Sequence, residues 1–255
     1  MTTTYLAYRI AAGDIPAATT RLAREAPVAR EIAYWRDHID KAPDIESFVA
    51  DRRLFSFAMK AFGLSDMTYA KAFIAKVLKD GIAAPAALAN KLSDPRYRDF
   101  VKTFDFNTYG TVTTSLSAAR EGVVERYLRQ TLEEKTGESS DGARLALYFQ
   151  RKASTLKSPM QLLADPALFK VTRVALDLPD SMVKAPLDKQ VEMIKARLDV
   201  ASLKDPARLD AFLKRFCAMN DLASAPTSPA VMIAQGGGGF GMDALMSIAR
   251  LKTGG

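Results

Sequence analysis

The sequence is poor in the residues that most often build disulfides and metal sites. It contains one cysteine, Cys217, and one histidine, His38, in 255 residues. A single cysteine excludes an intrachain disulfide and a site with several thiolate ligands. A lone histidine without partner ligands is more often structural than a metal ligand or half of a catalytic pair. We therefore expect no metal, no cofactor and no catalytic residues, and we interpret the chain as a protein that is not an enzyme.

Long apolar runs are also missing. No stretch of 18 apolar residues occurs, so we expect no membrane span. Residues 1–9 lack a basic segment followed by an apolar block, which argues against a cleaved secretory signal. These absences predict a cytoplasmic location. Cys217 lies in an apolar stretch, and we expect it to be a small buried hydrophobe.

The charge balance is basic but evenly mixed. The chain has 36 Lys and Arg against 29 Asp and Glu, a formal charge of +7. A nucleic-acid-binding protein is expected to gather its bases on one face or in one run. Here they alternate with acids, as in Arg24-Glu25 and Arg36-Asp37. This pattern favours a solvated surface with a positive excess, and nucleic-acid binding remains the less favoured alternative.

One stretch occurs twice, 114 residues apart. Residues 51–66 recur in diverged form as residues 165–180, and Tyr34-Trp35 recurs upstream as Tyr148-Phe149. The unchanged residues are Asp51, Leu54, Phe55, Ala61, Leu64 and Asp66, which recur as Asp165, Leu168, Phe169, Ala175, Leu178 and Asp180. This register predicts an internal duplication. It also predicts that Leu54 and Leu168 are both buried at matching places of two central helices.

The apolar residues are spaced as in helices. Val28, Ile32, Trp35 and Ile39, for example, fall on one side of a helix. The dipeptide Asp-Pro precedes three apolar-periodic segments, at residues 94, 165 and 205, where Asp can cap a helix and Pro can occupy its first position. Since no stretch alternates between apolar and polar residues, the sequence predicts an all-α fold.

The predicted organisation is one compact body with a tail. Two tandem, duplicated helical halves span about residues 28–104 and 142–218, and a helix over about 115–135 joins them. The body covers residues 1–222, and residues 223–255 form a flexible, glycine-rich tail. Within the body we expect a helix over 84–92 and a loop over 105–114. We expect Asp66 to begin a helix, Gly63, Gly81 and Gly137 to end helices, and Glu125 to pair with Arg129.

The tail carries a possible docking element after the four glycines of residues 236–239. Its apolar residues fall on one side of a short helix, and they are Phe240, Ala244, Leu245, Ile248 and Leu251. A helix this short needs a surface to bury that side. The surface could belong to a partner or to the body of the chain itself, and the sequence leaves both open. The same stretch matches G-x-G-x-x-G, but only 14 residues follow it, too few for a dinucleotide-binding unit.

Several strings, taken together and in order, resemble one family. They include Thr4-Tyr-Leu-Ala-Tyr-Arg9, Phe57-Ala-Met-Lys-Ala-Phe-Gly-Leu64, Lys91-Leu-Ser-Asp-Pro-Arg-Tyr97, Arg144-Leu-Ala-Leu-Tyr-Phe149 and Phe212-Leu-Lys-Arg-Phe216. They are similar to the DUF1217 family, uncharacterised helical proteins of alphaproteobacteria whose genes often lie beside flagellar basal-body genes. The resemblance covers about residues 3–222. It implies a non-enzymatic role associated with the flagellum, and the family offers no established catalytic residues to carry over.

The sequence thus favours a structural or interaction protein that assists flagellar assembly or motility, with a flagellar component as its protein partner. The alternative is a basic nucleic-acid-binding or regulatory binding module. The resemblance allows a second location, the flagellar basal body, if the protein is exported without a cleaved signal. The sequence indicates no oligomeric state.

Overall fold

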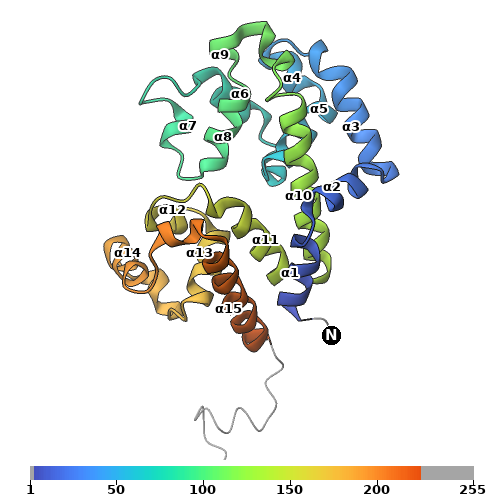
Figure 1. Cartoon of the computed structure of the whole chain (residues 1–255). Coiled ribbons are helices and arrows are strands. Elements are labelled where there is room, and N and C mark those ends of the chain that lie inside the picture. Colours follow the sequence, from blue (N-terminus) through green and yellow to red (C-terminus); the bar gives the residue numbers. More distant parts are fainter. Residues whose placement is uncertain (1–2, 225–255) are drawn as a thin grey trace, which may run out of the picture. The chain divides into compact units, whose positions relative to one another are not determined.

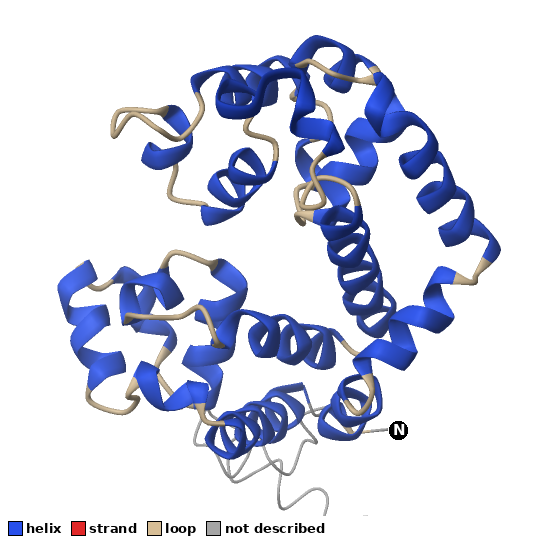
Figure 2. Cartoon of the chain, turned by 45° about the horizontal axis from the view of Figure 1, so that its top comes forward, coloured by secondary structure: helices blue, strands red, loops and turns tan. Residues whose placement is uncertain are grey.

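A computed structural model describes residues 3–224, and every regular element in that range is a helix (Figure 2). The predicted all-α fold is therefore confirmed for this part of the chain. One compact unit spans Met1–Asp221. The predicted tail helix, with all five of its docking residues, lies outside the described residues.

From residue 3 on, nine α-helices precede the long central helix. They are α1 (Thr4–Ala12), α2 (Ile15–Ala23), α3 (Ala26–His38), α4 (Ile45–Ala50), α5 (Arg52–Ala61), α6 (Lys71–Asp80), α7 (Leu88–Lys91), α8 (Pro95–Thr103) and α9 (Phe106–Tyr109). Short 3₁₀ helices connect some of them, namely η1 (Ile39–Lys41), η2 (Ser65–Met67) and η3 (Gly110–Ser115). The core of this half lies around α5, as the sequence predicted.

The central helix, α10 (Glu121–Ser139), contacts α1, α2, α5 and α11 (Figure 1). The helices that follow it are α11 (Asp141–Ala153), α12 (Pro159–Leu163), α13 (Pro166–Ala175), α14 (Leu187–Lys195) and α15 (Pro206–Ser224), with η4 (Asp180–Lys184) and η5 (Val200–Lys204) between them. Because α10 touches both α5 and α11, it joins the two halves.

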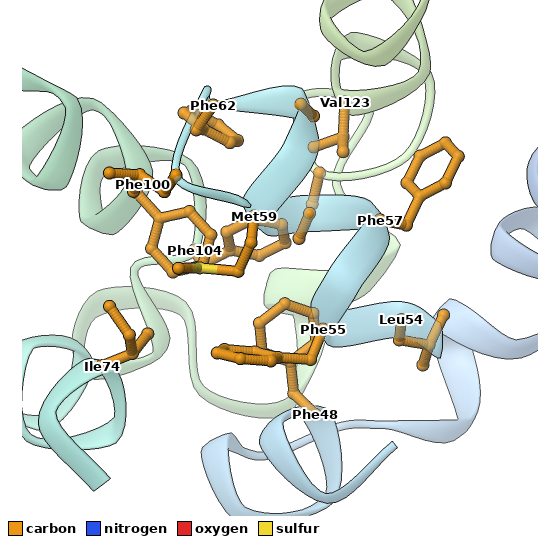
Figure 3. Packing of buried hydrophobic residues seen from close by; sticks show 14 of the residues in the cluster. Phe48, Leu54, Phe55, Phe57, Met59, Phe62, Ile74, Phe100, Phe104 and Val123 are labelled. Atoms are coloured by element: carbon orange, nitrogen blue, oxygen red, sulfur yellow. The ribbon is translucent and has the colours of Figure 1, made fainter. Parts of the chain in front are cut away.

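Each half has its own apolar core. In the first, Phe48, Phe55, Phe100 and Phe104 gather around Met59, which is fully buried (Figure 3). A separate cluster in the second half is built on α11, α13 and α15. Leu54 and Leu168 are exposed by only 1% and 3%, so the predicted burial of both is confirmed.

Contacts within the two halves match at a spacing of 114 residues. The Tyr34 hydroxyl donates to Asp51 Oδ2 at 2.7 Å, and the Tyr148 hydroxyl donates to Asp165 Oδ2. Each of these aspartates also caps a helix, since its Oδ1 accepts the N–H groups of the second and third residues after it at 2.9 to 3.1 Å. The same polar arrangement therefore begins α5 and α13.

The two helices also end alike. Gly63 after α5 and Asp177 after α13 have φ angles of 70° and 51°, the left-handed conformation that closes a helix. One residue further on, Leu64 and Leu178 donate their N–H groups back into the last helical turn at 2.8 and 2.9 Å. These matches are what a duplication predicts. The superposition of residues 34–66 on residues 148–180 stays a prediction.

Three local expectations in the first half are wrong. Asp66 does not begin a helix, because it lies inside η2, and α6 starts only at Lys71. The helix expected over 84–92 is confined to α7. The expected loop over 105–114 forms α9 and η3, because Asp105 Oδ1 accepts the Thr108 N–H at 3.1 Å and so begins a helical turn.

The joining helix is shifted from its expected place. It spans residues 121–139 instead of 115–135, and Gly137 lies inside it instead of ending it. A Cβ atom at Gly137 would lie 2.7 Å from Cδ of Arg144, so glycine here permits a close approach between α10 and α11. The predicted stops at Gly63 and Gly81, which both have positive φ angles, are confirmed.

Candidate functional site

Two adjoining cavities of about 420 and 890 Å³ lie along α10, between α8 and the segment from α11 to α13. They share Arg126, Arg151, Lys152, Asp99 and Asp165 in their linings, and we call them together the cleft. The basic side chains that line it are Arg96, Arg98, Lys102, Arg126, Arg129, Arg144, Arg151 and Lys152. The acidic ones are Asp94, Asp99, Glu125, Glu133, Glu134 and Asp165. Bases therefore exceed acids.

A buried carboxylate holds two arginines at the centre of the cleft. The Glu133 side chain is 2% exposed and accepts from Arg151 Nε and Nη2, both at 2.7 Å. Its Oε1 also accepts from Arg129 Nε at 3.2 Å. This arrangement ties α10 to α11. The expected pairing of Arg129 with Glu125 is wrong, since Arg129 turns to the buried acid four residues after it and Glu125 is exposed.

Both arginines keep their charge despite burial. Burial lowers the pKa of Arg129 below its ordinary value, while Glu133 opposes that shift. Burial also acts to lower the pKa of Arg151, but its two hydrogen bonds with Glu133 outweigh this effect and raise the pKa above the ordinary value. Because an arginine guanidinium stays protonated far above neutral pH, two cations here share one anion. The group as a whole is positive.

Tyr148 and Asp165 form the wall beside this group. The Arg151 guanidinium lies over the Tyr148 ring, 5.0 Å from its centroid. Burial and the neighbouring Asp165 raise the pKa of Tyr148, so its hydroxyl stays a hydrogen-bond donor at neutral pH. The first turn of α13 has no free N–H group that could bind an anion. Pro166 has no N–H, and the N–H groups of Ala167 and Leu168 donate to Asp165.

Further ion pairs fix the rim of the cleft. Arg96 binds Asp94 through Nε and Nη2 and also donates to the carbonyl oxygen of Gly63, which ties α8 to the end of α5. Lys152 Nζ lies 3.6 Å from Asp99 Oδ2 and so links α11 to α8 across the cleft. The first contacts strengthen one wall of the cleft, and the second connects its two walls.

Three bases of the cleft have no carboxylate partner among the described residues. Arg98 and Lys102 project from α8, and Arg126 projects from α10. All three are exposed. The Arg126 guanidinium lies over the ring of Phe62, 4.9 Å from its centroid. The cleft thus combines a paired interior with unpaired positive charge at its surface.

The single histidine and the single cysteine of the chain do not line the cleft. The His38 ring stacks on Tyr34 with centroids 3.9 Å apart, and its Nδ1 is 3.0 Å from the Tyr34 carbonyl oxygen. Cys217 is fully buried, as expected, and burial raises the pKa of its thiol to about 12. Among residues 3–224 no group of three or more His, Cys, Asp or Glu side chains could hold a metal ion.

Sequence reasoning did not find the cleft. It placed the docking site in the tail, outside the described residues, while the cleft is assembled from helices far apart in the chain. Two local signals were present. Arg129 and Glu133 have the spacing of a helical ion pair, and Tyr148 and Asp165 repeat Tyr34 and Asp51.

The comparisons with known proteins point to one family. The sequence model described as "Protein of unknown function (DUF1217)" matches residues 61–209, more than half of the chain. The chain is also similar to the crystal structure of a protein from Agrobacterium tumefaciens that was a structural genomics target. The identity is 43% and the TM-score 0.80, over 88% of this chain and 94% of that one. No curated protein matches the chain.

Proposed function

Since the chain belongs to the DUF1217 family of proteins of unknown function, we propose that it is a non-enzymatic structural or interaction protein that assists flagellar assembly or motility. The observation that carries the interaction role is the set of unpaired bases in a cleft whose interior is already held by ion pairs. The flagellar role rests on the resemblance to this family, whose genes often lie beside flagellar basal-body genes.

A rigid surface of this kind suits binding. Glu133 fixes Arg129 and Arg151, and the Arg96–Asp94 pair holds the α8 wall. The paired side chains of the interior are already ordered, so only the unpaired bases lose conformational entropy when a partner binds. The partner we propose is a protein of the flagellum.

The location follows from the same proposal. None of the described helices combines the length and apolar character that a membrane crossing requires. We place the protein in the cytoplasm, or at the flagellar basal body if it is exported without a cleaved signal.

Deletion of the gene tests the proposal. We expect the deletion strain to spread less in soft agar than the parent, and expression of the full chain to restore spreading. Growth rate in liquid medium is the control, and it should not change. A deletion strain that swims like its parent would contradict the flagellar role.

A nucleic-acid-binding module is the second candidate, and the excess of bases in the cleft is what favours it. Such binding depends steeply on salt, because neutralised phosphates release counterions. Retention of the protein on a DNA column at low salt, with release as salt rises, would support this alternative.

A further inference from the structure

Helix α8 carries two like charges on the wall of the cleft. Arg98 and Lys102 are four residues apart, so their side chains are neighbours on the helix surface. Like charges at this spacing destabilise a helix slightly. The acids at the start of α8 and within it are already paired, because Asp94 is bound to Arg96 and Asp99 faces Lys152. An anion from outside would remove this repulsion.

Arg126 is the unpaired base that lines both cavities. The residues three and four positions away on α10 are Gly122, Val123, Arg129 and Gln130, and none of them is acidic. Its own helix therefore supplies no partner. The guanidinium rests on a buried aromatic ring and keeps its donors available.

The second half has a small residue at the position where the first half has Arg53. In the first half Arg53 lies over the Tyr34 ring and pairs with Glu31 at 2.9 Å. The residue 114 positions after Arg53 is Ala167, which lines the cleft. In the second half the arginine over the tyrosine ring is Arg151, which comes from the same helix as Tyr148.

We propose that the cleft binds an acidic segment of a partner protein, whose carboxylates pair with Arg126, Arg98 and Lys102. This inference rests on the proposed interaction role and adds the chemistry of the partner. Guanidinium groups bind carboxylates through two parallel hydrogen bonds, which gives geometric specificity as well as attraction. The volumes of the two cavities fall in the range of sites that enclose small ligands or short segments.

The lining favours carboxylates on a protein over a nucleic acid. Asp99 and Glu125 line the same cavity as the unpaired bases, and they would repel a continuous phosphate backbone. Single-stranded nucleic acids also need aromatic faces on which bases stack. The rings at this place, Phe62 and Tyr148, each carry an arginine over one face.

Binding of a fluorescein-labelled hexaglutamate peptide to the full chain, followed by fluorescence anisotropy at low salt, tests this inference. We expect saturable binding that weakens as salt rises. Arg126→Glu and Arg126→Gln should each weaken it roughly tenfold or more, the loss that corresponds to one charge-assisted hydrogen-bonded contact. Arg208→Glu is the matched control, because Arg208 is an exposed arginine of α15 that lines neither cavity, and it should change binding less than about twofold.

Several results would overturn the inference. One is no peptide binding, and another is equal weakening by the control variant. A third is displacement of the peptide by free glutamate at the same carboxylate concentration, which would indicate a small-molecule site. A fourth is tighter binding of a single-stranded DNA oligonucleotide that is lost in the Arg126 variants. Melting temperatures show whether each variant is folded. Because motility of the deletion strain is measured separately, failure of the peptide test leaves the proposed function standing.

Discussion

At the scale of single residues, Glu133 holds two guanidinium groups with one buried carboxylate. Removal of one partner from a buried ion pair leaves the others without compensation, which costs about 3–5 kcal/mol. We therefore expect Glu133→Ala to lower the free energy of unfolding by about that amount in urea denaturation. Glu125→Ala, an exposed acid of the same helix, should change it by less than about 0.5 kcal/mol. Equal effects of the two substitutions would show that the central group is not structurally important.

Asp51 makes the stability of the folded protein depend on pH in the acid range. Burial acts to raise the pKa of Asp51, but hydrogen bonds from the Leu54 N–H, the Tyr34 hydroxyl and the Arg53 N–H bring it below the ordinary value. An acid whose pKa is lowered by folding stabilises the protein above its unfolded pKa, and this contribution is lost as pH falls through the folded value.

We accordingly expect wild type to be more stable than Asp51→Asn at pH 7. The difference in melting temperature should shrink below about pH 4, where the unfolded carboxyl begins to bind protons and then the folded one follows. Thermal melts between pH 7 and pH 2.5 measure it. A constant difference over that range would mean that the Asp51 carboxylate does not act through its charge.

The sequence could indicate single residues only where their partners are local. Asp165 was visible because it precedes a proline at the start of an apolar-periodic segment, Asp51 because it recurs as Asp165, and Cys217 because its neighbours are apolar. Glu133 was hidden in a mixed run of charges, since its burial depends on Arg151 of another helix. A buried ion pair between helices has no sequence signature of its own.

At the scale of elements, helix starts were the most predictable feature. Asp94 and Asp205 each accept a first-turn N–H, as their positions before proline predicted. Expectations failed where a residue serves tertiary packing. Gly137 looks like a stop in the sequence, but it lies inside α10, where the Arg144 side chain packs against it.

Asp205 offers the cleanest test of these caps. Its Oδ1 accepts the Arg208 N–H at 2.9 Å, and the residue is exposed. We expect Asp205→Ala to cost about 1 kcal/mol, and Asp205→Asn, which can still cap, to cost clearly less. Urea denaturation distinguishes them, and an equal loss from both would rule out capping as the cause. Asp94→Ala is less informative, because it would also deprive Arg96 of its partner.

At the scale of the whole molecule, the recurrence at 114 residues and the cleft are connected. The two halves begin and end their central helices with the same contacts, yet they differ at Arg53 and Ala167. In the first half Arg53 lies over the tyrosine ring, while in the second half Arg151 does so and Ala167 lines the cleft. The sequence shows this difference, but only the fold places it beside Arg126.

The central claim is that the unpaired bases of the cleft serve a partner of the flagellum. It is tested most directly in the deletion strain, by expression of the Arg98→Glu, Arg126→Glu double variant at the level of wild type. The control is the Arg30→Glu, Arg208→Glu double variant, which reverses the charge at two exposed arginines outside the cleft. We predict that the control restores spreading in soft agar and that the cleft variant does not. Restoration by both variants would contradict the claim.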